Sequence, residues 1–320
     1  MNYTLHQLQV FAKVVQTKSI TRASEELYLS QPAVSIQLKN FQDQFEIPLT
    51  EVVGRQLYVT DFGKEIYTMA ERIINEVHAI NYKTMAYKGF LTGRLVISIV
   101  STGKYVMPYF LTEFLKENKG IDLVMDVTNK SRVINSLQNN EVDFALVSVL
   151  PTDIKVHKET LMENQLFVIG NKDVKITKHI NTKDELKEMP LIFREEGSGT
   201  RYVMENYFSK HKISVRKKME LTTNEAVKQA VIAGLGNSVM PLIGLGDSLS
   251  SGDLKIIPTA GFPIKSQWQL IWLQSKKMSP LAQAYIDYVK KNKASILKDK
   301  FSWIDEISTS NKVIGGKIKK

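Results

Sequence analysis

The spacing of hydrophobic residues changes near residue 90, and this change constrains the fold more than any other feature of the chain. Before it, apolar residues recur three and four positions apart, the period of amphipathic helices. From Arg94 onward, the short runs RLVISIV (94–100), IDLVMDV (121–127) and DFALVSV (143–149) are typical of buried parallel strands, and helix-length stretches separate them. The sequence predicts a helical N-terminal part and then an α/β part of about 200 residues, long enough for two lobes.

Composition excludes several classes of protein. The 320 residues are 43% hydrophobic and 24% charged, as in globular proteins, and they include no cysteine. Disulfide frameworks and thiolate metal sites are therefore excluded. No apolar run is long enough to span a membrane, and the N-terminus lacks the pattern of a secretory signal. We expect a cytoplasmic protein with no cofactor, no metal site and no membrane partner.

The net charge of +10 does not by itself indicate a nucleic-acid partner. Residues 1–90 contain nine basic and nine acidic residues, which cancel. Part of the excess lies between Lys290 and the C-terminus, where nine lysines accompany three acidic residues. Because such tails are usually only solvated, we treat residues 301–320 as a basic C-terminal tail without an assigned role.

Three short helices are predicted at the N-terminus from their start signals. Thr4 and Gln7 have the spacing of a capping box, Ser19 is a second N-cap, and Ser30 opens a third helix with Pro32 in its first turn. The apolar residues of the third helix that face inward are Val34, Leu38, Phe41 and Phe45. Two short helices joined by a tight turn form a helix-turn-helix unit.

The opposite face of the third helix has an unusual composition. It carries Pro32, Ala33 and Ile36 beside Ser35 and Lys39. Apolar side chains on a helix in the major groove can contact thymine methyl groups, while serine and lysine bond bases or phosphates. The alternative is an ordinary three-helix module whose exposed isoleucine contacts another protein.

A wing and a long helix are predicted to follow. Leu57–Val59, preceded by the Gly54-Arg55 turn, is typical of a small β-wing in which Arg55 reaches a phosphate or the minor groove. A helix from about residue 61 to 89 then carries a narrow apolar stripe for almost four heptads, which indicates a coiled-coil dimer. Packing of this helix against the chain's own domains is the alternative. The stripe is Phe62, Ile66, Met69, Ile73, Val77, Ile80, Thr84 and Tyr87.

The stretch SITRASEELYLSQPAVSIQLKNF (19–41), with Val59-Thr60 and Gly63 after it, resembles the winged helix-turn-helix of LysR-type transcriptional regulators. The resemblance implies major-groove contacts from Gln31, Pro32, Ser35 and Ile36. Departures from the family pattern lie at residues 41–42, 45–46 and 49–52, at the end of the recognition helix and the entry to the wing. The full predicted DNA-contacting set is Arg22, Ser30, Gln31, Pro32, Ala33, Ser35, Ile36, Lys39 and Arg55.

Polar groups follow several of the predicted strands. In α/β folds, ligands bind at the carboxyl ends of strands, although a polar residue there is more often simply an N-cap. The turn REEGSGTR (194–201) is the clearest group, because its glycines expose backbone N–H groups. We expect Arg201 and the Ser198–Thr200 amides to hold an anion, with Arg194 either binding it too or pairing with Glu195 or Glu196. The predicted effector-binding set is Ser101, Thr102, Lys104, Asn129, Ser148, Arg194, Ser198, Gly199, Thr200, Arg201 and Asn224.

The second part of the chain resembles the effector domain of the RuBisCO-operon regulators within the LysR-type family. The similarity lies in YVMP (105–108), REEGSGTR, NEAVKQAVIAGLG (224–236), GFPI (261–264) and SPLAQAYIDYV (279–289). It implies a two-lobed α/β domain like type 2 periplasmic binding proteins, an effector that is a phosphorylated metabolite or NADPH, and dimers or tetramers. One departure is Ser266, where the branch generally has an arginine shortly before the tryptophan.

An enzyme or an exported solute-binding protein is a weaker interpretation. The five histidines are scattered without metal-ligand spacing, and Ser198 lacks a G-x-S-x-G context. We therefore expect a non-enzymatic DNA-binding regulator, a homodimer or homotetramer, that binds a pseudo-palindromic operator under the control of a small anionic metabolite. The expected domains are residues 1–60 (winged helix-turn-helix), 61–89 (linker helix), 94–300 (effector domain) and 301–320 (tail). Within the effector domain, lobe I is about 94–163 and 268–300, and lobe II about 164–267.

Overall fold

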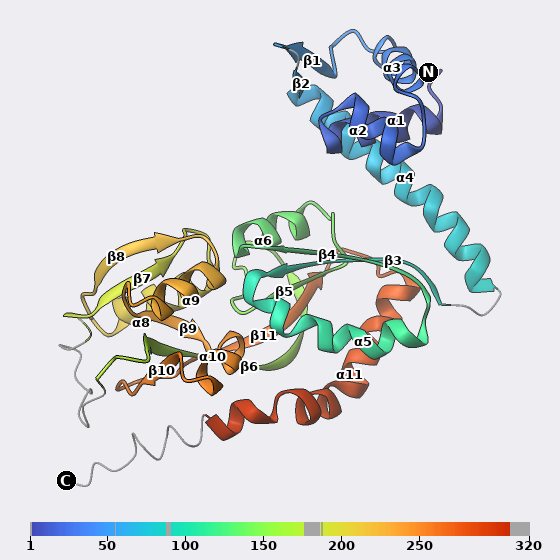
Figure 1. The fold of residues 1–320 in the computed structure, drawn as a ribbon. Coiled ribbons are helices and arrows are strands. Elements are labelled where there is room, and N and C mark those ends of the chain that lie inside the picture. The colour runs from blue at the N-terminus through green and yellow to red at the C-terminus, as the bar shows by residue number, and fades with distance from the viewer. Residues whose placement is uncertain (1, 55, 88–90, 176–185, 187, 308–320) are drawn as a thin grey trace. The chain divides into compact units, whose positions relative to one another are not determined.

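The structure is a computed structural model that describes residues 2–54, 56–87, 91–175, 186 and 188–307. It divides into two compact units, Met1–Gly93 and Arg94–Lys320, and each is described by itself (Figure 1). Among the described residues, no helix is both long enough and apolar enough to cross a membrane.

The three N-terminal helices begin where the start signals predicted. They are α1 (Leu5–Thr17), α2 (Ile20–Leu27) and α3 (Gln31–Gln42). Thr4 and Gln7 form the capping box of α1, and the side chains of Ser19 and Ser30 cap α2 and α3. Each cap satisfies an N–H group that has no partner within the helix, which fixes the start of the helix locally.

The inward face of α3 is the centre of the first core. Val34, Leu38 and Phe41 are buried against α1, and the Phe41 ring lies 5.1 Å from that of Phe11. Phe45, predicted as the next residue of the same helical face, lies beyond the end of α3 at Gln42, yet its ring packs 5.1 Å from Phe41. The apolar spacing thus identified the core residue but not the end of the helix.

The wing is a two-stranded antiparallel hairpin, β1 (Thr50–Val53) and β2 (Gln56–Val59). Arg55, in its turn, lies outside the described residues. Two of the departures from the family pattern contact each other here: the Gln42 side-chain oxygen accepts hydrogen bonds from the Thr50 amide (3.0 Å) and hydroxyl (2.6 Å). This pair links the end of α3 to the first wing strand. Two positions that depart from the family pattern are therefore hydrogen-bonded to each other.

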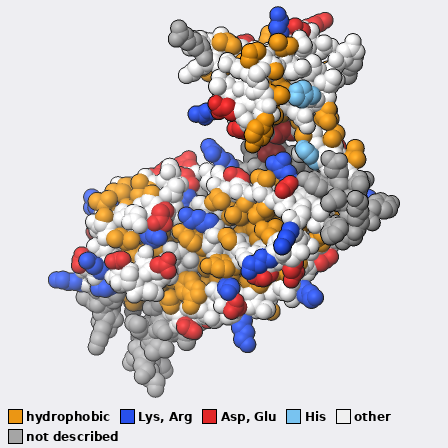
Figure 2. All heavy atoms as spheres, turned by 45° about the vertical axis from the view of Figure 1, so that its right-hand side comes forward, with side chains coloured by type: hydrophobic (Ala, Val, Ile, Leu, Met, Phe, Trp, Pro, Cys, Tyr) orange, Lys and Arg blue, Asp and Glu red, His pale blue; other side chains and the backbone are white. Residues whose placement is uncertain are grey.

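The predicted apolar stripe of the long helix α4 (Asp61–Tyr87) is covered at its start and exposed further along. Ala70 is buried, and Ile66 and Ile74 pack against the core of the helix-turn-helix. Met69, Ile73 and Ile80 instead remain exposed, at 59%, 45% and 64% of their surface. Packing within its own unit therefore accounts for Phe62 and Ile66 of the predicted stripe and leaves Met69, Ile73 and Ile80 uncovered. Figure 2 shows exposed hydrophobic side chains on this unit.

The second unit is built on a seven-stranded sheet in the order β10-β6-β11-β5-β3-β4, with β9 pairing to β6. Its strands are β3 (Thr92–Val100), β4 (Gly120–Thr128), β5 (Phe144–Val147), β6 (Val156–Asn171), β9 (Ser238–Pro241), β10 (Leu254–Ile257) and β11 (Ile264–Leu273). A second, parallel pair is β7 (Pro190–Arg194) with β8 (Arg216–Leu221). The helices of the unit are η1 (Ser101–Tyr105), α5 (Met107–Glu117), α6 (Lys130–Gln138), α8 (Gly199–Lys210), α9 (Asn224–Ile232), η2 (Leu242–Gly244), α10 (Gly246–Ser250) and α11 (Pro280–Lys300).

Two lobes share this sheet, as Figure 1 shows. Lobe I contains β3, β4 and β5, and lobe II contains β7 to β10. The strands β6 and β11 pair antiparallel over their length, from Val156↔Leu273 to Leu166↔Ile264, and run through both lobes. They include residues 163–164 and 267–268, the expected limits between the lobes.

One of the three strands predicted to be buried is not. β3 and β5 are largely buried and pair in parallel, as predicted. β4 has no buried residue, and Val124 and Val127 are 38% and 43% exposed. The prediction was wrong because only one face of β4 is partly covered: Ile121, Leu123 and Met125 are half-buried, whereas the alternate residues Asp122, Val124 and Asp126 are exposed. The strand is also the last in the sheet order.

The junction between the wing and α4 depends on a glycine. Thr60 Oγ1 donates a hydrogen bond to the Pro48 carbonyl (2.7 Å) and accepts one from the Gly63 amide (2.9 Å). A Cβ atom at Gly63 would overlap the Leu49 carbonyl oxygen. We expect Gly63→Ala to destabilise the protein by about 1–3 kcal/mol, since the chain must move apart to admit the methyl group.

Urea unfolding followed by circular dichroism measures this loss. Glu65→Ala, at an exposed position two residues further along the same helix, is the matched control and should change stability by less than about 0.5 kcal/mol. Equal stability of the two variants would show that the junction is not closely packed.

Candidate DNA-binding surface and effector site

The predicted DNA-contacting face of α3 is open to solvent. Gln31, Pro32 and Lys39 are exposed, and Ile36 is 57% exposed. Ala33 and Ser35 are half-buried. Such a mixed surface beside a packed inner face matches what a recognition helix requires, because its outer side chains must be free to reach base edges.

Other residues flank this face. Arg22 on α2 and Ser30 are exposed. Tyr28, in the turn between α2 and α3, is 96% exposed and has a left-handed backbone with φ of 55°. We had not included it among the DNA-contacting residues; the signal available was a large aromatic residue in the turn before the recognition helix.

The turn at 194–201 links β7 to α8 and approaches lobe I closely. Gly197 has φ of +81°, and a Cβ there would lie 2.6 Å from Ser131 Oγ. A Cβ on Gly199 would lie 3.4 Å from Ser148 Oγ. The two glycines therefore allow the backbone of lobe II to lie against polar side chains that follow β4 and β5 of lobe I.

Ser198 is the N-cap residue of α8 but makes no side-chain capping hydrogen bond. Every other serine, threonine or asparagine N-cap in the described part of the chain does make one. Ser198, Gly199 and Thr200 are all buried. The first-turn N–H groups of α8 thus remain without a side-chain partner at a buried helix N-terminus, where the helix dipole favours negative charge.

The polar atoms of the Arg194 side chain are bonded to other groups of the protein. Its side chain is only 4% exposed and forms two hydrogen bonds with the Glu195 carboxylate, at 2.8 and 2.9 Å. It also donates to Ser101 Oγ (3.2 Å), and Asn224 donates to the same oxygen (3.1 Å). Arg194, Ser101 and Asn224, distant in sequence, are therefore brought together, and of the two roles considered for Arg194 the structure shows the pairing with Glu195.

Arg201 is also surrounded by carboxylates. Nε donates to Glu205 (2.7 Å), Nη1 donates to Glu220 (2.9 Å), and Nη2 lies 3.6 Å from Glu196. The hydrogen bond to Glu205 is the main reason that the pKa of Arg201 is raised. Its positive charge is therefore balanced in this arrangement, and an anion would have to displace the exposed Glu196 to reach it.

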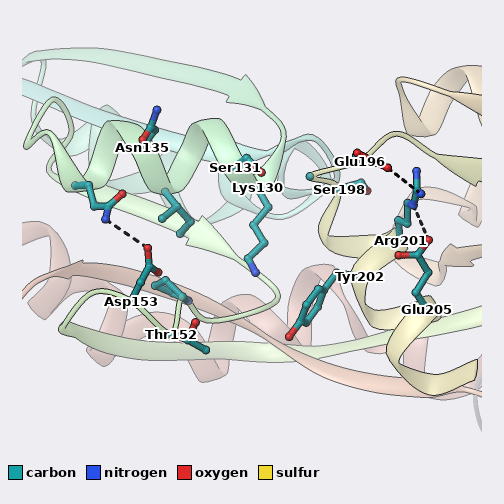
Figure 3. A pocket seen from close by; sticks show the side chains of 14 residues that line it. Lys130, Ser131, Asn135, Thr152, Asp153, Glu196, Ser198, Arg201, Tyr202 and Glu205 are labelled. Carbon is teal, nitrogen blue, oxygen red and sulfur yellow. Dashed lines mark hydrogen bonds and ion pairs between the residues drawn. The ribbon is translucent and has the colours of Figure 1, made fainter. Parts of the chain in front are cut away.

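A groove of about 540 Å³ lies beside the turn, between α6 and α8. In Figure 3 the Lys130 side chain extends across this groove toward Tyr202; its Nζ atom lies 4.5 Å from the centre of the Tyr202 ring. Among the described residues, no carboxylate forms an ion pair with Lys130. Lys130 and Tyr202 were not among the predicted effector residues, although Lys130 directly follows the predicted Asn129.

The remaining predicted effector residues have more local contacts. The Asn129 side chain accepts from the Arg132 amide (3.0 Å) and caps α6, so the capping alternative accounts for it. Lys104 is exposed and lies 5.0 Å from the Tyr105 ring. Thr102 is buried in η1 and Ser148 is half-buried. Gly234, with φ of +79°, follows the end of α9, as expected of a helix C-cap.

Comparison with known proteins identifies both units. Residues 5–64 match a family described as "Bacterial regulatory helix-turn-helix protein, lysR family", and residues 88–294 match "LysR substrate binding domain". The RuBisCO operon transcriptional regulator of Allochromatium vinosum is 37% identical over 290 residues, covering 90% of this chain and 96% of the relative. The HTH-type transcriptional activator CmpR of Synechocystis is 34% identical over 289 residues, covering 90% and 95%.

Solved structures agree with this assignment. The Synechocystis PCC6803 CcmR regulatory domain in complex with 2-PG is 35% identical, with a TM-score of 0.59, and covers 62% of this chain and 96% of that one. CbnR, a LysR family transcriptional regulator, has a TM-score of 0.68 over 90% of this chain and 98% of its own, at 17% identity, which shows a shared fold. The chain therefore belongs to the LysR family of bacterial transcriptional regulators, with a DNA-binding helix-turn-helix and an α/β substrate-binding domain.

Proposed function

We propose that this regulator senses a small phosphorylated anion bound at the N-terminus of α8, and that the anion controls operator binding by the helix-turn-helix. The observation that carries the proposal is the buried, uncapped first turn of α8, which lies against Ser131 and Ser148 of the other lobe. A phosphate accepts hydrogen bonds from such N–H groups and is favoured by the helix dipole.

The charges in the groove favour binding of the anion by backbone N–H groups over binding by lysine and arginine side chains alone. Lys130 and Arg201 line the groove together with three carboxylates, Asp153, Glu196 and Glu205. Charge alone would not attract an anion there, so directed N–H groups must supply the selectivity. Lys130, without a carboxylate partner among the described residues, is the cation we assign to the ligand.

The comparison with CcmR supports the chemical class. The regulatory domain of that protein, 35% identical to this chain, was solved in complex with 2-PG. The abbreviation denotes 2-phosphoglycolate, a phosphorylated carboxylate. We therefore propose this compound as the first probe.

For the DNA-binding unit we propose contacts from the exposed face of α3 and from the wing that contains Arg55. The exposed stripe of α4 is proposed as the homodimer seam, which would present two recognition helices to a pseudo-palindromic operator. Because its relatives are named as transcriptional regulators, we propose no catalytic role, and we place the protein in the cytoplasm with its DNA. The domain and lobe limits given above remain part of this proposal, with the effector domain extended from residue 300 to residue 307, because Phe301 and Ile304 are buried.

Replacing Gln31 or Ser35 by alanine should weaken binding to the DNA upstream of the protein's own gene by about 1–3 kcal/mol, because each change removes a group that can bond a base edge. Affinity for unrelated DNA of equal length should change little. Fluorescence anisotropy at fixed salt measures both. Equal losses on the two DNAs would show that these side chains do not read sequence.

Replacing Lys130 by alanine should weaken 2-phosphoglycolate binding by about 10- to 100-fold, as loss of a charge-assisted hydrogen bond costs roughly 1.5–3 kcal/mol. Isothermal titration calorimetry on the full chain gives the dissociation constant. Lys116→Ala removes an exposed lysine from α5 and is the matched control, expected to bind like the parent. Unchanged affinity in Lys130→Ala would place the anion elsewhere.

Placing a glutamate at Ile73 should convert the dimer to a monomer, because the charge would be buried in an apolar seam. Asn75→Glu is the control. Asn75 is also exposed, but it is two residues from Ile73 and so lies on the opposite side of the helix, about 200° away. Sedimentation velocity distinguishes the states. A monomeric parent, or a dimeric Ile73→Glu variant, would refute the proposed seam.

A further inference from the structure

A short segment after α11 joins the two lobes of the substrate-binding domain. The chain continues from α11 through Phe301 into one further helical stretch, residues 302–307. Phe301 and Ile304 are only 4% and 6% exposed, although the segment begins beyond residue 294, where the family match ends. We call residues 301–307 the strap.

On the lobe I side the strap packs against α5. The Phe301 ring lies 5.4 Å from that of Tyr109 in an edge-to-face arrangement, and 6.3 Å from that of Phe110. Phe110 is itself fully buried. Because α5 packs against α11, this contact anchors the start of the strap in the core of lobe I.

On the lobe II side the strap packs against α10. A Cβ on Gly246 would lie 3.3 Å from Cη2 of the Trp303 ring, so the indole covers the first residue of this helix. The helix connects β9 to β10, and both of these strands pair with the lobe II end of β6. Phe301 and Trp303, only two residues apart in the strap, therefore contact opposite lobes.

The strap lies close to another contact between the lobes. Tyr105, at the end of η1 in lobe I, packs against Gly244 of lobe II, where an added Cβ would lie 2.8 Å from its ring. Its hydroxyl donates to Glu225 on α9 (3.4 Å). Gly244 and Gly246 belong to one short segment of lobe II, so this segment is held by Tyr105 and by Trp303. Moving the lobes apart would break both contacts.

We propose that the strap holds the two lobes at the spacing seen here and so favours the arrangement that binds the ligand. Loosening it lets the lobes separate, and the apparent affinity for a ligand falls with the fraction of molecules in the competent arrangement. The affinity part of this inference rests on the proposed function; the effect on lobe spacing does not.

The spacing of the lobes can be measured directly. Since the chain has no cysteine, Lys116→Cys in lobe I and Lys255→Cys in lobe II, both exposed, provide two unique sites for spin labels. Pulsed electron resonance would compare the full chain, a chain ending at Lys300 and a chain ending at Ile307. We expect a single narrow distance for the full chain and for the chain ending at Ile307, and a broader, longer distribution for the chain ending at Lys300.

Point variants separate the strap from general loss of stability. Trp303→Ala should reproduce the broadened distances, whereas Trp303→Phe, which keeps an aromatic ring over Gly246, should restore them. With 2-phosphoglycolate as the probe, Trp303→Ala should raise the dissociation constant about threefold to tenfold. If the parent does not bind this compound, the proposed ligand is wrong, and the distance measurements still decide the role of the strap. Identical distances with and without residues 301–307 would overturn the inference.

Discussion

The antiparallel pairing of β6 and β11 is the interaction on which the substrate-binding domain depends. These two strands are the only elements among the described residues that run through both lobes and pair along their length, from Val156↔Leu273 to Leu166↔Ile264. A bulge between Trp268 and Gln269 interrupts the register once. Where the branch generally has an arginine, Ser266 accepts a hydrogen bond from the buried Asn164 across the pair (3.0 Å). Ser266 thus forms an uncharged hydrogen bond between β6 and β11, the two strands that join the lobes.

Because the pairing of β6 and β11 joins the lobes along the sheet, the ends of strands from the two lobes can meet at the boundary between the lobes. Arg194, Ser101 and Asn224 form one hydrogen-bonded network there, and the 194–201 turn lies against Ser131 and Ser148. The arginines of the turn are neutralised by neighbouring carboxylates, and the backbone N–H groups of α8 remain as the directed donors. The chemistry of the site then follows from a helix N-terminus more than from net charge.

Contacts away from that boundary complete the connection between the lobes. Tyr105 and Trp303 hold the same short segment of lobe II, one from η1 and one from the strap. On the proposed function, an effector bound between the lobes would act on the equilibrium that we propose these contacts to bias. In the N-terminal unit, α4 contributes Phe62 and Ile66 to its own core and leaves Met69, Ile73 and Ile80 of the same apolar stripe exposed.

The sequence by itself determined what depends on local periodicity and capping. The starts of α1, α2 and α3 and the inward residues of α3 were predicted, because their signals lie within a few residues of one another. The two-lobed α/β class and the LysR family were predicted from short motifs that recur along the chain, each of which can be recognised locally. Only the tertiary structure decided what depends on distant partners. It brought Arg194 and Asn224 to Ser101, placed Glu220 beside Arg201, left β4 at the edge of the sheet and brought Trp303 to Gly246. A side chain's residue type sets its charge and size, but the groups that neutralise or cover it come from other elements of the fold.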